Sequence, residues 1–302
     1  MSRTSGGTRA LMAALRERLG ASDPAPPRVA MPVVPAPPAR VYTPRREPLR
    51  GDADAARHTT ALLGIGHVGT RYATDVVLQF QAELAVAHEA VAAELPDGWA
   101  SDHGFLPLVS RVSNHREFLL RPDLGRRLAP DSLQRLRDQA ERGKDVQLIL
   151  ADGLSATACM GSGVQLHEEL VRACEHRGLS VGTPVCARYA RVWLEDEIGQ
   201  EVGAKVAIIL LGERPGLGTG DGLSAYVVYE PAIGKTDGDR NMMSNIHARG
   251  TPPAEAAHRL SALAAAMIEQ RTSGVTLDLA RVAADIERGY RAPQVRQRLV
   301  GG

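Results

Sequence analysis

The fold class is decided by the stretch Gly203-Ala-Lys-Val-Ala-Ile-Ile-Leu-Leu-Gly-Glu-Arg-Pro-Gly-Leu-Gly218. Residues 206–211 are six consecutive apolar residues without a charge, and half of them are β-branched. A run this short, closed by a glycine, is typical of a strand buried on both faces, as parallel strands usually are. Glu213 and Arg214 follow at once, so we expect them at the carboxyl end of this strand, where open α/β sheets bind ligands. A tight turn with a surface ion pair is the simpler alternative.

The segments around this strand alternate between strand and helix patterns. Apolar runs predict strands over residues 146–151, 185–194 and 225–229, and an amphipathic pattern predicts a helix over residues 164–177. Such alternation implies parallel pairing with right-handed crossovers, so the sequence predicts an α/β fold with a mostly parallel sheet and flanking helices. Other patterns predict helices over residues 75–95, 132–142, 254–272 and 277–290, and a loop over residues 244–253.

Composition divides the chain into five parts. We expect a short amphipathic helix in residues 1–20, a disordered Pro/Ala-rich linker in 21–50, a mainly helical region in 51–143, the α/β domain in 144–274, and a helix with a basic tail in 275–302. A tethered N-terminal helix has a use only where something binds it. A frayed tail is the alternative.

Bulk composition argues against several classes of partner. The net charge is +1 and aromatic residues make up 4% of the chain, so we expect neither nucleic-acid nor membrane binding. No apolar run is long enough to span a bilayer. Cys159, Cys174 and Cys186 are widely spaced and form no zinc pattern, which favours a reduced, cytoplasmic setting and predicts no metal site.

A dinucleotide-binding turn must be considered at Gly64-Ile-Gly-His-Val-Gly69, which matches G-x-G-x-x-G. The apolar run before it is short, and no second strand ending in an acid follows it. We therefore favour a glycine-rich turn that leads into a helix, with Thr74 or Asp75 as N-cap. A stand-alone dinucleotide-binding protein remains the alternative function.

The chain offers no catalytic set. Gly178-Leu-Ser-Val-Gly182 matches the G-x-S-x-G of hydrolases, but a helix precedes it and a strand follows, the reverse of a nucleophile elbow. Asp152 at the end of a predicted strand is a candidate general base. Acids there also cap the next helix, and we favour the cap. We assign no catalytic residue.

A series of longer motifs occurs in one order along the chain: Arg121-Pro-Asp-Leu-Gly-Arg-Arg-Leu128, Asp152-Gly-Leu-Ser155, Val181-Gly-Thr-Pro184, Asp196-Glu-Ile-Gly199, Gly212-Glu-Arg-Pro-Gly-Leu-Gly218, and Ser244-Asn-Ile-His247 with Gly250-Thr-Pro-Pro253. Together they resemble the small (light) subunit of ethanolamine ammonia-lyase. The resemblance runs from about residue 60 to residue 274.

This resemblance implies a role in a cofactor-dependent complex. Enzymes of the family use adenosylcobalamin to convert ethanolamine to acetaldehyde and ammonia. A large subunit holds the substrate, and a Rossmann-like small subunit covers part of the coenzyme at the interface, so the cofactor supplies the hard chemistry. Several copies of each subunit assemble into the active complex. Relatives that live in bacterial microcompartments carry an N-terminal helix as an encapsulation tag, which implies that residues 1–20 contact a shell.

The resemblance also implies three coenzyme contacts. These are Val192, in Arg188-Tyr-Ala-Arg-Val192, Glu213 of the Gly212–Gly218 motif, and Met242, two residues before Ser244. Relatives can have Cys at the third position, so Met242 leaves a backbone contact as the expectation. Gly212 and Gly216 are expected to leave room for the corrin ring.

Overall fold

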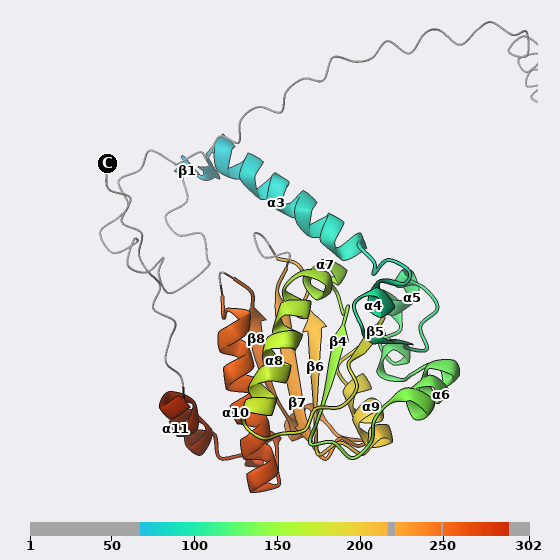
Figure 1. Ribbon diagram of the computed structural model, residues 1–302. Helices are drawn as coiled ribbons and strands as arrows, with labels where there is room; N and C mark the ends of the chain where they lie inside the picture. The colour runs from blue at the N-terminus through green and yellow to red at the C-terminus, as the bar shows by residue number, and fades with distance from the viewer. Residues whose placement is uncertain (1–66, 217–220, 249, 290–302) are drawn as a thin grey trace, which may run out of the picture. The chain divides into compact units, whose positions relative to one another are not determined.

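The computed structural model describes residues 67–216, 221–248 and 250–289 (Figure 1). Residues 1–20, the linker 21–50 and Gly64 to Gly66 lie outside them. The strands are β1 His67–Val68, β2 Arg71–Tyr72, β3 Leu106–Val109, β4 Val146–Ala151, β5 Val185–Arg188, β6 Val206–Gly212, β7 Leu223–Tyr229 and β8 Arg240–Ile246. The α-helices are α3 Thr74–Ala92, α4 Trp99–Asp102, α5 His115–Leu120, α6 Pro130–Gln139, α7 Ala156–Ala158, α8 Val164–His176, α9 Leu194–Val202, α10 Pro253–Gln270 and α11 Leu279–Gly289. None of these helices has the length and apolar character to cross a membrane.

Six strands form one mixed sheet in the order β3-β5-β4-β6-β7-β8. The first four strands of this order run parallel, and β7 and β8 pair antiparallel at one side. The predicted α/β class with a mostly parallel sheet is therefore confirmed. β6 pairs with β4 from Val206 opposite Val146 to Leu211 opposite Ala151, and every residue of β6 is buried. The apolar run at residues 206–211 is thus a strand covered on both faces, as predicted.

Three expectations about the strands were wrong. The strand predicted over residues 185–194 ends at Arg188, because the backbone turns at Tyr189, whose φ is 55°. β3 was not predicted, and residues 244–246 belong to β8 rather than to a loop. β8 escaped prediction because Arg240-Asn-Met-Met-Ser-Asn-Ile246 is mostly polar or amphipathic, as an edge strand with one open face can be.

Helices cover the two faces of the sheet unequally. On one face, α8 and α10 pack over β4, β6 and β7, and in Figure 1 they lie in front of the strands. On the other face, α6 and α9 cover the parallel half, where Leu194 and Ile198 of α9 pack with Ile209 of β6. Met242, on the antiparallel half of that second face, is 53% exposed. Part of this face is therefore open to a ligand or partner.

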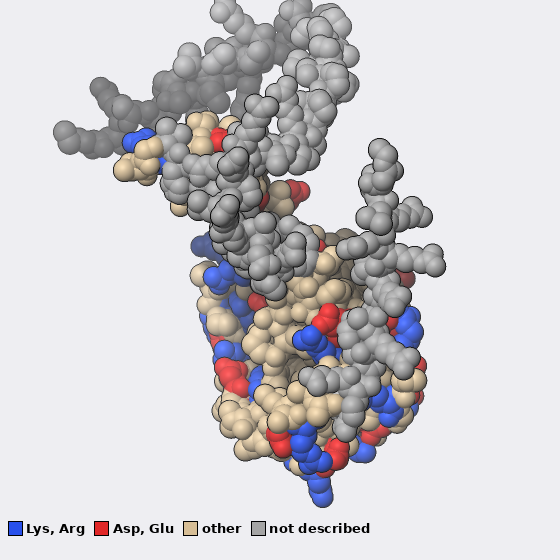
Figure 2. All heavy atoms as spheres, turned by 90° about the vertical axis from the view of Figure 1, so that its left-hand side faces the viewer, with Lys and Arg blue, Asp and Glu red and all other residues tan. Residues whose placement is uncertain are grey.

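A buried ion cluster joins α9 to β8, in the antiparallel half of the sheet. The guanidinium of Arg240 on β8 bonds to Glu195 and lies 3.0 Å from Oδ2 of Asp196. All three side chains are nearly inaccessible. Elsewhere charge is dispersed: on the face shown in Figure 2, Lys and Arg are interspersed with Asp and Glu around an area of other residues.

Candidate functional site

Two of the three predicted coenzyme contacts meet in one pocket. Glu213, just past β6, and Met242 of β8 both line an open cavity of about 360 Å³ on the uncovered part of the sheet. We call this cavity the sheet-face pocket. Its walls are Glu213, Arg214, Gly222, Leu223, Ser224, Tyr226, Met242, Ser244, Asn245 and His247. It therefore lies at the carboxyl end of β6, where ligand binding was predicted.

Glu213 is positioned by its backbone and by a tyrosine of the neighbouring strand. Its N–H donates to the carbonyl of Gly222 at 3.0 Å, which continues the β6–β7 pairing. The Tyr226 hydroxyl donates to Oε1 of Glu213 at 3.4 Å. Burial, together with the Glu213 carboxylate, raises the pKa of Tyr226 to about 12, so the phenol stays protonated at neutral pH. The structure gives the other carboxylate oxygen no hydrogen bond from the described residues.

Ser224 contributes a second polar group to this pocket. Its side chain is fully buried and, among the described residues, its hydroxyl has no hydrogen-bond partner. An unpaired buried hydroxyl is costly unless a ligand satisfies it. None of the described residues is hydrogen-bonded to Ser224 as a base would be in an activated serine nucleophile.

The Ser244–His247 motif forms the far wall of the pocket, and its turn explains the residues that accompany it. Asn245 has a φ of 60°, which asparagine tolerates better than most residues. Its side-chain oxygen lies 2.7 Å from Nε2 of His247, and its carbonyl accepts the N–H of Thr251 at 2.9 Å. A side chain at Gly250 would collide with the Asn245 carbonyl. The motif therefore shapes one side of the pocket.

Asp152 does not cap the following helix, so that prediction was wrong. The N-cap of α7 is Ser155, whose hydroxyl accepts the N–H of Ala158 at 3.1 Å. The Asp152 carboxylate instead accepts the N–H groups of Tyr189 at 2.8 Å and Ala190 at 3.3 Å, which ties the end of β4 to the turn after β5. Burial raises the pKa of Asp152 to about 6. Its role in the structure is to fix the carboxyl edge of the sheet.

Gly212 also has a different role from the one predicted. A side chain there would collide with the carbonyl oxygens of Asp152 and Ser155. Gly153 of the same loop, with a φ of 53°, lies against the Gly212 carbonyl, and the N–H of Leu154 donates to that carbonyl at 2.8 Å. The space at Gly212 is thus filled by the loop after β4 and leaves no room there for a corrin ring.

Val192 lies near the sheet-face pocket but is not part of its wall. It is half-buried and packs on the same core cluster as Tyr226. The neighbouring Arg191 has its pKa lowered mainly by burial and also by Arg126 and Arg214, so its loop lies within electrostatic range of the Glu213–Arg214 turn. Val192 follows β5, which runs parallel to β4 and β6, so it lies beyond the same carboxyl edge of the sheet as Glu213.

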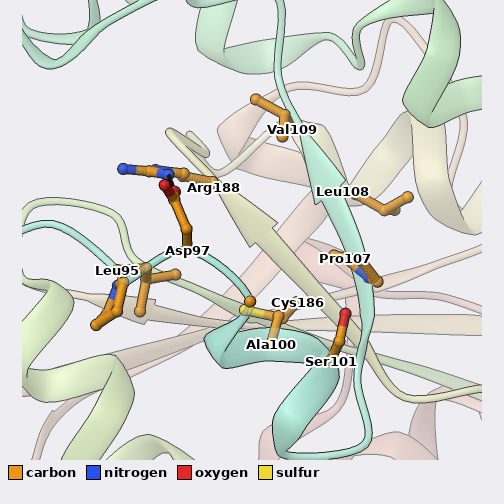
Figure 3. A pocket seen from close by; sticks show the side chains of 11 residues that line it. Leu95, Asp97, Ala100, Ser101, Pro107, Leu108, Val109, Cys186 and Arg188 are labelled. Atoms are coloured by element: carbon orange, nitrogen blue, oxygen red, sulfur yellow. Dashed lines mark hydrogen bonds and ion pairs between the residues drawn. The ribbon is translucent and has the colours of Figure 1, made fainter.

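A second cavity of about 190 Å³ lies between α4, β3 and β5 and contains none of the predicted contacts (Figure 3). Its walls are mostly apolar, and Arg188 at its rim pairs with Asp97 at 3.2 Å. The thiol of Cys186 also borders it. The hydrogen bond with Cys186 and burial raise the pKa of Cys159, which keeps that thiol protonated and unreactive. We assign no catalytic group to this cavity.

The described residues give little support to a metal site or to the dinucleotide-binding turn considered from the sequence. They include no cluster of three or more metal-ligating side chains. Residues 67–72 form a β-hairpin with Gly69 in its turn at a φ of 62°, whereas a dinucleotide fingerprint opens a helix within the motif. α3 begins only at Thr74, its N-cap is Ala73, and neither Thr74 nor Asp75 caps it, contrary to prediction.

Sequence reasoning missed Ser224 and Tyr226, and assigned no role to the Ser244–His247 motif. The first two alternate along β7, so their common face could have been noticed, but not that this face is uncovered. Residues 52–278 match the family model described as ethanolamine ammonia-lyase light chain (EutC). This match covers most of the chain and every wall of the sheet-face pocket, so the chain belongs to the ethanolamine ammonia-lyase light-chain family.

Proposed function

We propose that this chain is the coenzyme-holding small subunit of adenosylcobalamin-dependent ethanolamine ammonia-lyase, which converts ethanolamine to acetaldehyde and ammonia together with a large subunit. Membership of the light-chain family supports the complex. The observation that carries the coenzyme role is that Glu213 and Met242, from separate strands, line one open pocket at the carboxyl edge of the sheet.

The polar groups of the sheet-face pocket suit the edge of a corrin. That ring carries amide side chains whose NH₂ groups are donors, and a carboxylate accepts them in charge-assisted bonds. Glu213 supplies the carboxylate, and the unpaired hydroxyl of Ser224 can pair with an amide. The exposed thioether of Met242 offers apolar contact. At about 360 Å³ the pocket takes only part of so large a coenzyme, so the large subunit must cover the rest.

In this proposal the small subunit binds and orients but does not break bonds. The bound coenzyme supplies the bond-breaking chemistry. Glu213 holds an amide, Tyr226 fixes the Glu213 carboxylate, and Met242 and Val192 contact the coenzyme through backbone or apolar atoms. We propose no catalytic residue in this chain.

The proposed setting is the cytoplasm, inside a microcompartment where the host makes one, with residues 1–20 as the segment that contacts the shell. The three cysteines support a reducing compartment, since all are free thiols and all are buried.

The test is co-expression of this chain with the large subunit of the same organism. We expect the two subunits to co-purify. We expect the complex to show the absorbance of bound adenosylcobalamin and to deaminate ethanolamine. The chain alone is expected to be inactive and to bind coenzyme weakly. Turnover by the isolated chain, or no complex on co-expression, would contradict the proposal. Millimolar NAD is expected to leave the melting temperature of the chain unchanged; a rise of several degrees would demand a real nucleotide site.

A further inference from the structure

Exposed large hydrophobic residues are concentrated on α3 and on the β2 strand just before it. Eleven large hydrophobic side chains are exposed in the described residues, and five of them fall between residues 72 and 86. These five are Tyr72, Val77, Leu78, Leu84 and Val86. Scattered exposed hydrophobic residues are normal, but a concentration of this kind marks an interaction surface.

The exposed apolar residues lie on more than one side of the helix. Val77 and Leu84 are seven residues apart and share a face, and Leu78 and Val86 lie on the next face around the axis. The side toward the sheet is marked by Ala87 and Ala90, which are buried. The exposed sides also carry polar residues such as Gln81 and His88, but apolar side chains on more than one side of a helix are best buried by a partner that surrounds it. A groove that embraces α3 therefore fits better than a flat partner surface.

Charge on α3 has a single sign. Its 19 residues include Asp75, Glu83 and Glu89 but no Lys or Arg. Pairing with α3 of a second copy would bring acids against acids, which is unfavourable in a partly desolvated interface. The charge instead fits a different chain whose apolar groove is bordered by Lys or Arg side chains.

The position of α3 connects it with the proposed coenzyme edge. Just beyond its end, Glu94 accepts hydrogen bonds from Arg188 at 2.6 Å and from the Tyr189 hydroxyl at 2.8 Å. α3 also contacts α7, which follows β4 at the carboxyl edge of the sheet. Glu213 lies at that same edge, after β6. The second cavity begins directly after α3, with Leu95 and Asp97 in its wall (Figure 3).

From these observations we infer that α3 is a docking helix, which inserts into an apolar, Lys/Arg-bordered groove of the large subunit. This inference rests on the proposed function, because it takes the large subunit as the partner. It adds a second contact region to the coenzyme-holding edge. A 19-residue helix is about 28 Å long, so α3 can supply a substantial part of a stable interface.

The test compares full-length variants for binding to the large subunit by biolayer interferometry. The double variant Leu78→Asp with Leu84→Asp should bind on the order of 100-fold more weakly, because it places charges in the enclosed interface. Leu120→Asp is the matched control: Leu120 is 68% exposed on α5, outside this surface, and its variant should bind within about twofold of wild type. Glu83→Lys with Glu89→Lys should also weaken binding, and less so at high salt.

The isolated double variant should keep the wild-type melting temperature, because its altered side chains are exposed. Three results would overturn the inference. They are wild-type binding by the double variant, a lowered melting temperature that shows the face is covered within the chain, and a wild-type self-association that the variant abolishes. If the wild-type chain does not bind the large subunit at all, the proposed function fails as well. If the double variant still forms an active complex, only the docking role fails.

Discussion

The hydroxyl of Tyr226 lies 3.4 Å from Oε1 of Glu213, and Tyr226 is also the register partner of Met242 across β7 and β8. The Tyr226 side chain therefore lies between Glu213 and Met242, the two proposed coenzyme contacts. Because paired residues of neighbouring strands share a face, this register fixes the distance between Glu213 and Met242 more firmly than the β6–β7 loop could. Strands β7 and β8 thus supply much of the pocket wall, and the β6–β7 loop adds Glu213, Arg214 and Gly222.

The first prediction concerns Glu213 itself. Hydrogen bonds to charged groups contribute roughly 1.5–3 kcal/mol. At about 1.4 kcal/mol per tenfold change, Glu213→Ala should weaken coenzyme binding by the assembled complex on the order of 10- to 100-fold. Turnover at saturating coenzyme should change much less. Spectroscopic titration measures this, with Glu168→Ala on the exposed side of α8 as control. An unchanged coenzyme affinity would favour the alternative, in which Glu213 belongs to a surface ion pair and does not bind the coenzyme.

The second prediction separates Tyr226 from Glu213. Tyr226→Phe removes only the hydroxyl, and a neutral donor at this distance contributes about 0.5–1.5 kcal/mol, so affinity should fall roughly 2- to 10-fold. If Tyr226 acts by orienting the carboxylate, its substitution should have no further effect once Glu213→Ala is present. A double-mutant cycle on coenzyme affinity measures this coupling. Fully additive losses would show that the two residues act independently.

The sequence predicted best the strands whose burial is complete. β6 is apolar from Val206 to Leu211 without interruption, β4 is apolar except for the buried Gln147, and both were placed within a residue of their bounds. β5 was extended too far because its apolar alternation continues to Trp193. What ends it is the bond from Tyr189 to Asp152, a contact between residues far apart in the chain. The local alternation of apolar residues gives no information about contacts between residues far apart in the chain.

The site was predicted only in part, for a related reason. Glu213 could be placed at a strand end because the strand itself was evident. Ser224 and Tyr226 reach the pocket because β7 turns back antiparallel to β6, and none of the described helices covers that half of the face. The periodicity of apolar residues in the sequence reveals neither the direction of a strand nor which part of a sheet face a helix covers. The family motifs named Met242 without showing why it and Glu213 belong together.

A third prediction tests the packing at Gly212. Gly212→Ala should destabilise the chain by about 1–3 kcal/mol or more, because the new methyl group meets backbone oxygens of Asp152 and Ser155 that cannot easily move. Gly161→Ala is the matched control, since a side chain there meets nothing within 4 Å. Urea unfolding of both variants gives the comparison. Equal free energies of unfolding for the two variants would mean that the loop after β4 can move aside without an energetic cost.

The fourth prediction uses the buried cluster beneath α9. Two carboxylates share Arg240, and Oε2 of Glu195 has no hydrogen-bond partner among the described residues. Burial raises the pKa of Glu195 to about 8. The folded chain then keeps a proton that the unfolded chain releases above its ordinary pKa of 4.5. The stability from this group is therefore complete below that value and is lost as pH rises toward 8, by at most about 1.4 kcal/mol per pH unit.

Glu195→Gln cannot titrate, so the melting temperature of wild type relative to this variant should fall between about pH 5 and about pH 8. Glu201→Gln is a useful contrast. The hydrogen bond from Arg137 lowers the pKa of Glu201, so its contribution is lost only as pH falls below this window. A wild-type advantage over Glu195→Gln that is constant or grows with pH would show that Arg240 keeps both carboxylates ionised.

The fifth prediction concerns the N-terminal segment. Deleting residues 1–49 should leave ethanolamine turnover and coenzyme affinity of the assembled complex within about twofold of wild type, and should change only solubility or packaging. The family match begins at residue 52, and every wall of the sheet-face pocket lies at residue 213 or beyond. The deletion also leaves α3 intact, so docking should survive it. Co-purification and turnover measure both properties. A complex that fails to assemble without residues 1–49 would place a docking contact in the linker and would remove the case for a separate packaging segment.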